Sequence, residues 1–146
     1  MTLSFSHFGI CVTDLERSYR FYCEGLGFEP VETHRVGPEF GTLMELDDVD
    51  LESRMIRRDG VTVELLGFHS PPVTGPDTRR PMNQLGLTHL SLRVDDVEAV
   101  AATGEALGGS VVRGTRTSVD LGQVQLDFLY CTDPDGVRIE LMDLPS

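Results

Sequence analysis

Stretches of alternating apolar and polar residues recur along this chain, and a period of two predicts half-buried β-strands. In residues 4–12 the apolar positions Phe8, Ile10 and Val12 fall on one face, and residues 88–94 alternate in the same way. Each stretch is followed by apolar residues at helical spacing that end at glycines, which predicts a helix after each strand. The apolar stripe of the first predicted helix consists of Leu15, Tyr19, Tyr22 and Leu26.

Turn signals divide the rest of the chain into hairpins. Asp59-Gly60 lies between two alternating segments and predicts a two-residue hairpin turn. The DPDG sequence at 133–136 predicts a second hairpin. Residues 38–48 do not alternate, and Pro38 suits the first turn of a helix, so a short helix or a loop is expected there. Both longer helices are expected to begin at capping aspartates: Asp14, and Asp95 or Asp96.

An internal repeat gives the domain organisation. Residues 7–16 (HFGICVTDLE) align with 89–98 (HLSLRVDDVE), and 59–66 (DGVTVELL) align with 135–142 (DGVRIELM), with five identities in the eight positions of the second pair. The sequence therefore predicts an α+β protein made of two tandem βαβββ modules that form one structural domain overall. The expected segments are residues 1–68, a Pro- and Gly-rich linker or lid over 69–86, and residues 87–146.

Composition and charge narrow the classes of function. The 146 residues carry 24 acidic and 12 basic side chains, a formal net charge of −12, and every basic residue except histidine is arginine. Nucleic acids and anionic membranes bind basic surfaces, so neither is an expected partner. Schiff-base chemistry is excluded because there is no lysine.

The N-terminal residues show no signal-peptide pattern, and no apolar run approaches the length of a membrane span. Cys11, Cys23 and Cys131 are too few and too scattered for a disulfide framework or a cysteine zinc site. They are expected to be buried, reduced thiols, and the protein is expected to be cytoplasmic.

Four polar residues occupy matched positions in the repeat. His7 and His89 are expected in the middle of the first strand of each module, and Glu64 and Glu140 in the middle of the last strand. In all four strands the apolar residues lie on the opposite face, so these side chains are expected to face a cavity.

Two imidazoles and two carboxylates converging on a cavity require a partner, because an unpaired buried carboxylate is costly. A divalent metal held by His7, Glu64, His89 and Glu140 supplies that partner, and these ligand types suit Ni, Co, Mn, Fe or Zn. His34 and His69 have no counterparts in the repeat and are expected at the surface or in the lid.

The chain resembles the vicinal oxygen chelate superfamily, which includes glyoxalase I, methylmalonyl-CoA epimerase, extradiol dioxygenases, and fosfomycin and bleomycin resistance proteins. The resemblance is carried by HFGICVTDLERSYRFYCEGLGF, GLTHLSLRVDDVE and DPDGVRIEL, and it covers nearly the whole chain. It implies that the two sheets pair into a cupped half-barrel that holds the metal. It also implies a small-molecule substrate with a carbonyl and an adjacent oxygen.

The order His, Glu, His, Glu is similar to the ligand set of bacterial glyoxalase I. That resemblance implies a metal-dependent lyase or isomerase that moves a proton next to a carbonyl through an enolate. Glu140 would be the leading catalytic base, and Glu64 a candidate for the second proton transfer.

The resemblance is also compatible with other functions. An epimerase-like enzyme would use a further glutamate, for which Glu39 or Glu45 is a candidate. A dioxygenase, or a small-molecule binding or resistance protein, is the other alternative. The arginine pairs 57–58 and 79–80 either attract CoA phosphates or are ordinary surface charges. A homodimer is expected, because small sheets leave edges that need covering and members of the superfamily commonly dimerise.

Overall fold

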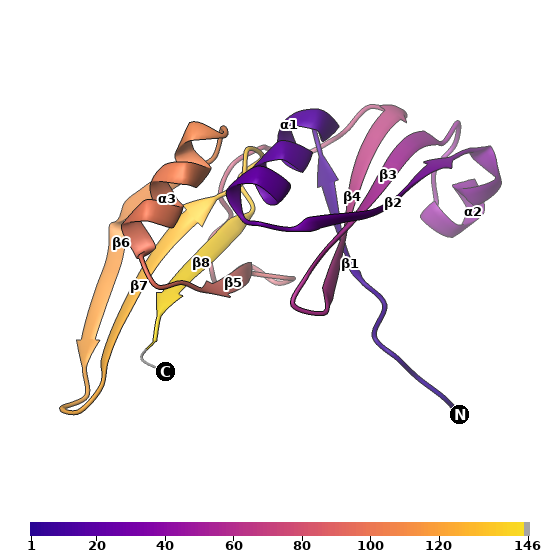
Figure 1. Cartoon of the computed structure of the whole chain (residues 1–146). Helices are drawn as coiled ribbons and strands as arrows, with labels where there is room; N and C mark the ends of the chain where they lie inside the picture. Colours follow the sequence, from indigo (N-terminus) through magenta and orange to yellow (C-terminus); the bar gives the residue numbers. More distant parts are fainter. Residues whose placement is uncertain (145–146) are drawn as a thin grey trace. The chain divides into compact units, whose positions relative to one another are not determined.

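A computed structural model describes residues 1–144 of the chain. The chain divides into two compact units, Met1–Gly75 and Pro76–Ser146. Each unit contains its own four-stranded sheet and helix (Figure 1). The predicted α+β class and the two βαβββ modules are confirmed, and neither sheet closes into a barrel.

The sheet of the first unit has the strand order β1-β4-β3-β2, in which β1 runs parallel to β4 and the other neighbours are antiparallel. Its strands are β1 (Phe8–Val12), β2 (Glu29–Val36), β3 (Asp50–Arg58) and β4 (Val61–Ser70). Its helical segments are α1 (Leu15–Arg20), a π-helical turn (Phe21–Gly25), a 3₁₀ turn (Pro38–Phe40) and α2 (Gly41–Met44). The 3₁₀ turn and α2 occupy the region expected to be a short helix or loop.

The second unit repeats this topology with the order β5-β8-β7-β6, and β5 is parallel to β8. Its elements are β5 (His89–Arg93), α3 (Val97–Ala106), β6 (Ser110–Asp120), β7 (Gln125–Thr132) and β8 (Arg138–Asp143). The helix α3 packs against β6, β7 and β8 (Figure 1). The repeat in the sequence is therefore a repeat of the strand order and of the helix that follows the first strand, whereas the 3₁₀ turn and α2 belong to the first unit.

Local signals set the helix starts and hairpin turns as expected. The Asp14 carboxylate accepts a hydrogen bond from the Arg17 amide at 3.0 Å, and the Asp96 carboxylate accepts one from the Ala99 amide at 2.9 Å. These contacts satisfy amides of the first helical turn that have no partner within the helix. Asp59 and Gly60 both have positive φ (49° and 80°), as the predicted two-residue hairpin turn requires.

The predicted apolar stripe of the first helix is partly wrong. Phe21 and Tyr22 are both buried although they are adjacent, and Phe21 was not in the stripe. The reason is the π-helical turn, in which the Leu26 amide donates to the Phe21 carbonyl five residues back, at 3.2 Å. A widened turn changes the angular spacing of side chains, so two neighbours face the sheet together.

The last strand of each module separates an apolar face from a polar one, as expected from its alternation. Val63 and Leu65 on β4 are fully buried, and Ile139 and Leu141 on β8 are 1% exposed. They belong to two cores, one in each unit. The glutamates between these residues point to the opposite face of each sheet.

Strand boundaries differ from the expectation at both histidines. His7 precedes β1, and His89 is the first residue of β5, so neither lies in the middle of a strand. Pairing begins at Phe8, opposite Val63 of β4, and this register sets where the strand starts. His69 is exposed but lies within β4 and not in a lid, because β4 stays paired with β3 as far as Ser70.

Only one cysteine fits the expected burial. Cys131 is buried, Cys23 is partly buried and Cys11 is exposed. Cys11 lies on edge strand β1, on the face opposite Ile10 and Val12, which explains its exposure. Burial raises the pKa of the Cys131 thiol to about 11, so this thiol stays protonated at neutral pH.

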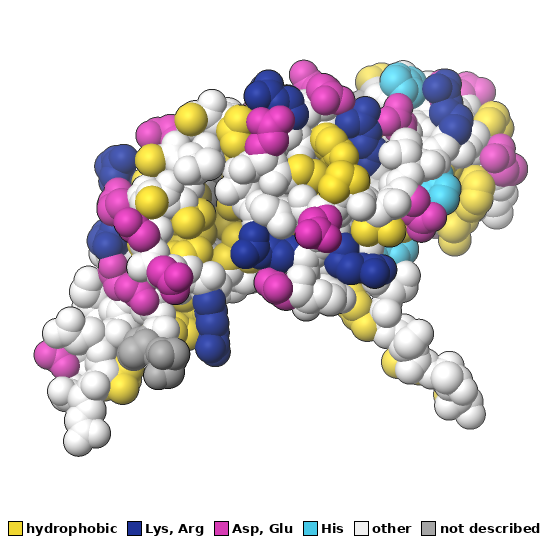
Figure 2. Space-filling model, viewed as in Figure 1, with side chains coloured by type: hydrophobic (Ala, Val, Ile, Leu, Met, Phe, Trp, Pro, Cys, Tyr) yellow, Lys and Arg dark blue, Asp and Glu magenta, His cyan; other side chains and the backbone are white. Residues whose placement is uncertain are grey.

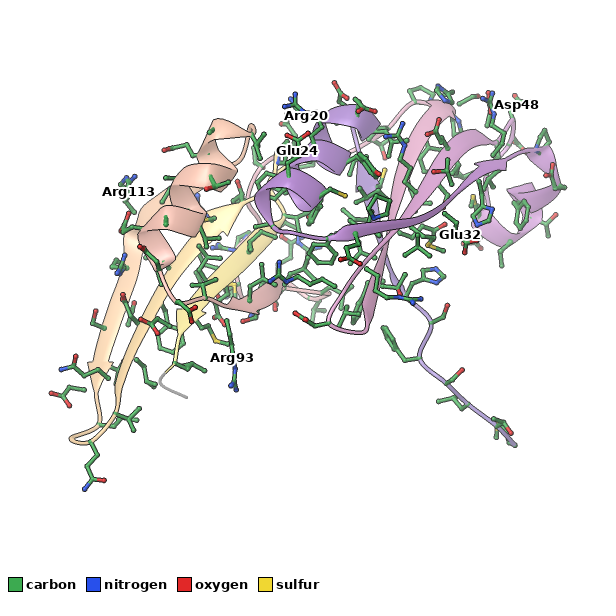
Figure 3. The ribbon with its side chains drawn as sticks, in the orientation of Figure 1. Arg20, Glu24, Glu32, Asp48, Arg93 and Arg113 are labelled. Atoms are coloured by element: carbon green, nitrogen blue, oxygen red, sulfur yellow. The ribbon has the colours of Figure 1, made fainter. Side chains whose placement is uncertain are left out.

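Acidic and basic side chains are interspersed over the visible surface (Figure 2). Many arginines pair with carboxylates, including Arg54 with Glu16 at 2.8 Å, and Arg20 with Glu24 at 3.2 Å (Figure 3). In the described part of the chain, no helix is both long enough and apolar enough to cross a membrane.

Replacing Gly136 with alanine should lower the free energy of unfolding by about 1–3 kcal/mol. Gly136 has φ 90°, and an added Cβ would lie 2.7 Å from the backbone carbon of Thr78 and 3.0 Å from the Arg79 amide nitrogen. Urea denaturation measures the loss. Gly60→Ala is the matched control, because Gly60 also has positive φ but its Cβ would meet nothing within 4 Å. Equal losses in both variants would contradict the packing argument.

Candidate metal centre

The first predicted histidine and glutamate meet within the first unit. The Nε2 atom of His7 lies 3.1 Å from Oε2 of Glu64, and their side chains are 34% and 19% exposed. The Ser53 hydroxyl on β3 donates to the other carboxylate oxygen, Oε1, at 2.6 Å. We call His7 and Glu64 the first half-site.

The second unit contains the equivalent pair. The Nε2 atom of His89 lies 3.8 Å from Oε2 of Glu140, with the side chains 25% and 19% exposed. Two hydroxyls hold this carboxylate: Ser91 on β5 donates to Oε1 at 2.8 Å, and Tyr130 on β7 donates to Oε2 at 3.2 Å. We call His89 and Glu140 the second half-site.

Both histidines are oriented in the same way by the residue before them. The Ser6 hydroxyl lies 2.8 Å from Nδ1 of His7, and the Thr88 hydroxyl lies 2.9 Å from Nδ1 of His89. When Nδ1 carries the proton and donates it to the hydroxyl, Nε2 keeps its lone pair and faces the carboxylate. A hydrogen bond of this kind on the outer nitrogen is typical of histidines that bind metals through the other nitrogen.

The donor atoms fit a divalent metal. Two ligand atoms about 2.1 Å from one ion and at right angles are about 3.0 Å apart. The Nε2–Oε2 distance of 3.1 Å in the first half-site matches this spacing, and 3.8 Å in the second is somewhat longer. Within residues 1–144, no group of three or more His, Cys, Asp or Glu side chains forms a complete metal site. The structure therefore brings together each predicted pair, and each unit supplies two of the four predicted ligands.

The surroundings of the two glutamates differ although the backbone positions are equivalent. Glu64 is opposite Gly9 and Met55 in its neighbouring strands, whereas Glu140 is opposite Ser91 and Tyr130. Ser91 and Tyr130 were not identified from the sequence. The available signal was the repeat itself: aligning the modules shows which positions lie beside each glutamate and how they differ.

Tyr130 is built to act as a hydrogen-bond donor. Burial raises the pKa of its phenol, and the Glu140 carboxylate raises it further. The phenol therefore stays protonated at neutral pH and donates to Glu140. Its ring also meets the His89 ring edge-on, with centroids 5.6 Å apart. Tyr130 thus contacts both members of the second half-site.

The other candidate residues from the sequence are not part of either half-site. Glu39 and Glu45 are exposed on the 3₁₀ turn and at the end of α2. His34 is half exposed and lies 3.3 Å from Glu32.

The arginine pairs also have contacts within the protein. Arg57 donates to the Thr62 hydroxyl at 3.1 Å, Arg58 donates to the Leu26 carbonyl, and Arg80 donates to the Leu87 carbonyl at 2.6 Å. Each of these three arginines therefore has at least one contact within the protein.

Two βαβββ units, each with a histidine at the start of its first strand and a glutamate within its last, define a class of duplicated α+β proteins. The sequence model of the Glyoxalase/Bleomycin resistance protein/Dioxygenase superfamily matches residues 4–141. The chain belongs to this superfamily, which confirms the family resemblance described above.

Two curated relatives cover almost the whole chain. This chain is 31% identical over 140 residues to the uncharacterized protein YaeR of Escherichia coli. The alignment covers 94% of this chain and 93% of YaeR. The chain is 26% identical over 144 residues to the Arabidopsis thaliana protein named Glyoxylase I 4, covering 98% of this chain and 72% of that protein.

Solved structures share the fold at lower sequence identity. A glyoxalase family protein from Bacillus cereus has a TM-score of 0.83 with 21% identity, covering 100% of this chain and 97% of its own. The fosfomycin resistance protein FosX from Listeria monocytogenes, crystallised with Mn(II) and sulfate, has a TM-score of 0.54 with 15% identity. That alignment covers 98% of this chain and 93% of FosX. The fold is therefore shared with a protein that was crystallised with a metal ion.

Proposed function

We propose that this protein is a glyoxalase-like, metal-dependent lyase or isomerase that moves a proton on the carbon next to a carbonyl group. The observation that carries the proposal is the duplicated half-site, in which a histidine nitrogen and a glutamate oxygen face each other in both units. The likeness to Glyoxylase I 4 supports the same reaction class. The substrate is a small molecule with a carbonyl and an adjacent oxygen.

In this proposal His7, Glu64, His89 and Glu140 hold one divalent ion, of the group Ni, Co, Mn, Fe or Zn. Such an ion, when bound, polarises a carbonyl oxygen and makes the neighbouring C–H bond more acidic. The chain supplies the base that takes this proton and the groups that hold the base in place.

Glu140 is the better candidate for the base, and its contacts support this choice. A carboxylate that leaves the ion needs other donors, and the Ser91 and Tyr130 hydroxyls already contact both of its oxygens. Its distance to His89 is also longer than the distance from Glu64 to His7. Glu64, with one hydroxyl donor, is suited to remain a ligand and to assist the second proton transfer.

Deuterium exchange tests the reaction class. The metal-loaded protein is incubated in heavy water with 2-oxoaldehyde–thiol adducts and with 2-methyl-branched acyl-CoA thioesters. Incorporation of deuterium at the carbon next to the carbonyl supports the proposal, and the better substrate class separates a glyoxalase-like enzyme from an epimerase-like one. Binding without exchange would instead favour a binding protein. Oxygen uptake with Fe(II) would favour a dioxygenase.

We further propose a homodimer. The edge strands are β1 and β2 in the first sheet and β5 and β6 in the second, and β1 and β5 have only five residues each. Open strand edges favour pairing with another chain unless they are covered. Light scattering at micromolar concentration should give twice the mass of one chain. The mass of a single chain across that concentration range would refute the dimer.

A further inference from the structure

Arg138 stands on the same face of the second sheet as the second half-site. It lies two residues before Glu140 on β8, and it is the register partner of His89 on β5. Side chains two residues apart on a strand share a face and are about 6.6 Å apart along it. The guanidinium of Arg138 is therefore a positive charge beside both His89 and Glu140.

Two contacts fix the position of this guanidinium. Its Nε donates to the Arg80 carbonyl at 3.0 Å, and its central carbon lies 5.2 Å from the centre of the Tyr130 ring. A guanidinium stacked on an aromatic face and anchored through Nε keeps both terminal nitrogens for a ligand. Since Tyr130 also donates to Glu140, the same side chain positions the carboxylate and the cation.

Arg138 is not neutralised by the protein. Among residues 1–144, no carboxylate lies within ion-pair distance of it, although the chain has 24 acidic residues. The other arginine that is partly buried, Arg54, does have such partners: it lies 2.8 Å from Glu16 and 2.7 Å from Glu52. A fixed, half-buried and unpaired arginine is a suitable binding group for an anion.

The first module places its cation differently. In the repeat, Thr62 occupies the position of Arg138, and its hydroxyl accepts a hydrogen bond from Nε of Arg57 on β3 at 3.1 Å. Arg57 is exposed, whereas Arg138 is partly buried and stacked on the Tyr130 ring. The two half-sites therefore present different cations to a substrate, and the one in the second unit is held in place by an aromatic ring.

We infer that Arg138 binds the carboxylate of an anionic substrate, and that small 2-oxo carboxylates are a substrate class of this site. This inference rests on the proposed function, because it names the substrate class of the same site. A guanidinium binds a planar carboxylate through two parallel hydrogen bonds. Phosphonates offer related oxygens, so the experiment includes both anions.

Isothermal titration calorimetry with matched probes tests the inference. Pyruvate and pyruvamide have nearly the same shape and both present two adjacent oxygens, but only pyruvate is charged. In the Mn(II)-loaded protein, Arg138→Gln should weaken pyruvate binding by about 10- to 100-fold, the effect of losing hydrogen bonds to a charged group. Pyruvamide binding should change by less than about threefold, because that amide gains little from a cation.

The controls separate a bound anion from a general effect of charge. Arg113→Gln removes the same charge from an exposed position on edge strand β6, two strands away from β8 (Figure 3), and should change pyruvate binding by less than about twofold. Arg138→Lys keeps the cation but loses the planar fork, so its affinity should be intermediate. If circular dichroism shows that Arg138→Gln does not fold, Arg138→Lys replaces it in the titrations.

Equal pyruvate binding by the parent and Arg138→Gln would overturn the inference, as would no pyruvate binding by the loaded parent. Arg138-dependent binding of methylphosphonate alone would also overturn the carboxylate assignment. Metal content is measured separately for each protein. If the parent takes up no metal, the proposed function fails. The same titrations on the metal-free protein then show whether Arg138 binds the carboxylate of pyruvate without a metal.

Discussion

Replacing Glu140 with glutamine should lower the rate of proton exchange by about 100- to 10,000-fold, the usual contribution of a general base. Glutamine has the same length but does not accept a proton at neutral pH. The Ser91 and Tyr130 hydroxyls can still bond to it, since a hydroxyl both donates and accepts. The fold should therefore persist while turnover is lost. Deuterium incorporation from heavy water measures the rate.

The matched control is Glu64→Gln, which removes the equivalent carboxylate of the first unit. If Glu64 is chiefly a ligand, this variant should lose metal affinity, and its exchange rate per bound ion should fall less than in Glu140→Gln. Asp is a poorer probe than Gln, because shortening the side chain displaces the carboxylate by about 1 Å and so confuses position with basicity. Undiminished exchange in Glu140→Gln would refute the role of Glu140 as base.

The order of strands and helices was predictable because it depends on local signals. Alternation, capping aspartates and the Asp59-Gly60 turn each act over a few residues, and the repeat supplied every signal twice. The π-helical turn was not predictable in this way. It depends on a shift in backbone hydrogen bonding, seen in the bond from the Leu26 amide to the Phe21 carbonyl, and that shift leaves no periodicity in the sequence.

The candidate site was predictable to the extent that the repeat marks it. The repeat singled out His7, Glu64, His89 and Glu140, and the structure places each histidine beside the glutamate of its own unit. The hydroxyl donors of Glu140 required knowledge of the register between strands. Tyr130 lies ten residues before Glu140 and reaches it only because β7 and β8 pair with these residues opposite each other.

The two half-sites are similar in ligands and different in their neighbours, and this difference has a functional consequence. A duplicated pair with identical neighbours would offer no preference for which carboxylate binds the ion and which moves the proton. Ser91, Tyr130 and Arg138 surround only the second pair. In the first unit Ser53 contacts Glu64, and Arg57 contacts Thr62 beside it. Because Tyr130 both holds the Arg138 guanidinium and bonds Glu140, the anionic end of a substrate is expected at the second unit.

Replacing His89 with alanine should remove most of the metal. The variant loses one of four proposed ligands and leaves Glu140 without its imidazole neighbour. The loss of affinity should exceed the about 10- to 100-fold effect of removing an outer hydrogen-bond partner. Thr88→Ala, which removes the hydroxyl 2.9 Å from Nδ1, should show that smaller effect. His34→Ala is the control, because His34 is exposed and pairs with Glu32, so it should keep the parental metal content.

Elemental analysis of protein purified without chelator and reconstituted with Ni, Co, Mn, Fe or Zn measures the content, with about one ion per pair of half-sites expected in the parent. The predicted order of affinity is parent and His34→Ala, then Thr88→Ala, then His89→Ala. This order follows from the geometry, because Nε2 of His89 would be a direct ligand and the Thr88 hydroxyl only fixes the ring. A parent that takes up almost no metal would refute the metal centre, and equal losses in His89→Ala and His34→Ala would show that the bound ion lies elsewhere.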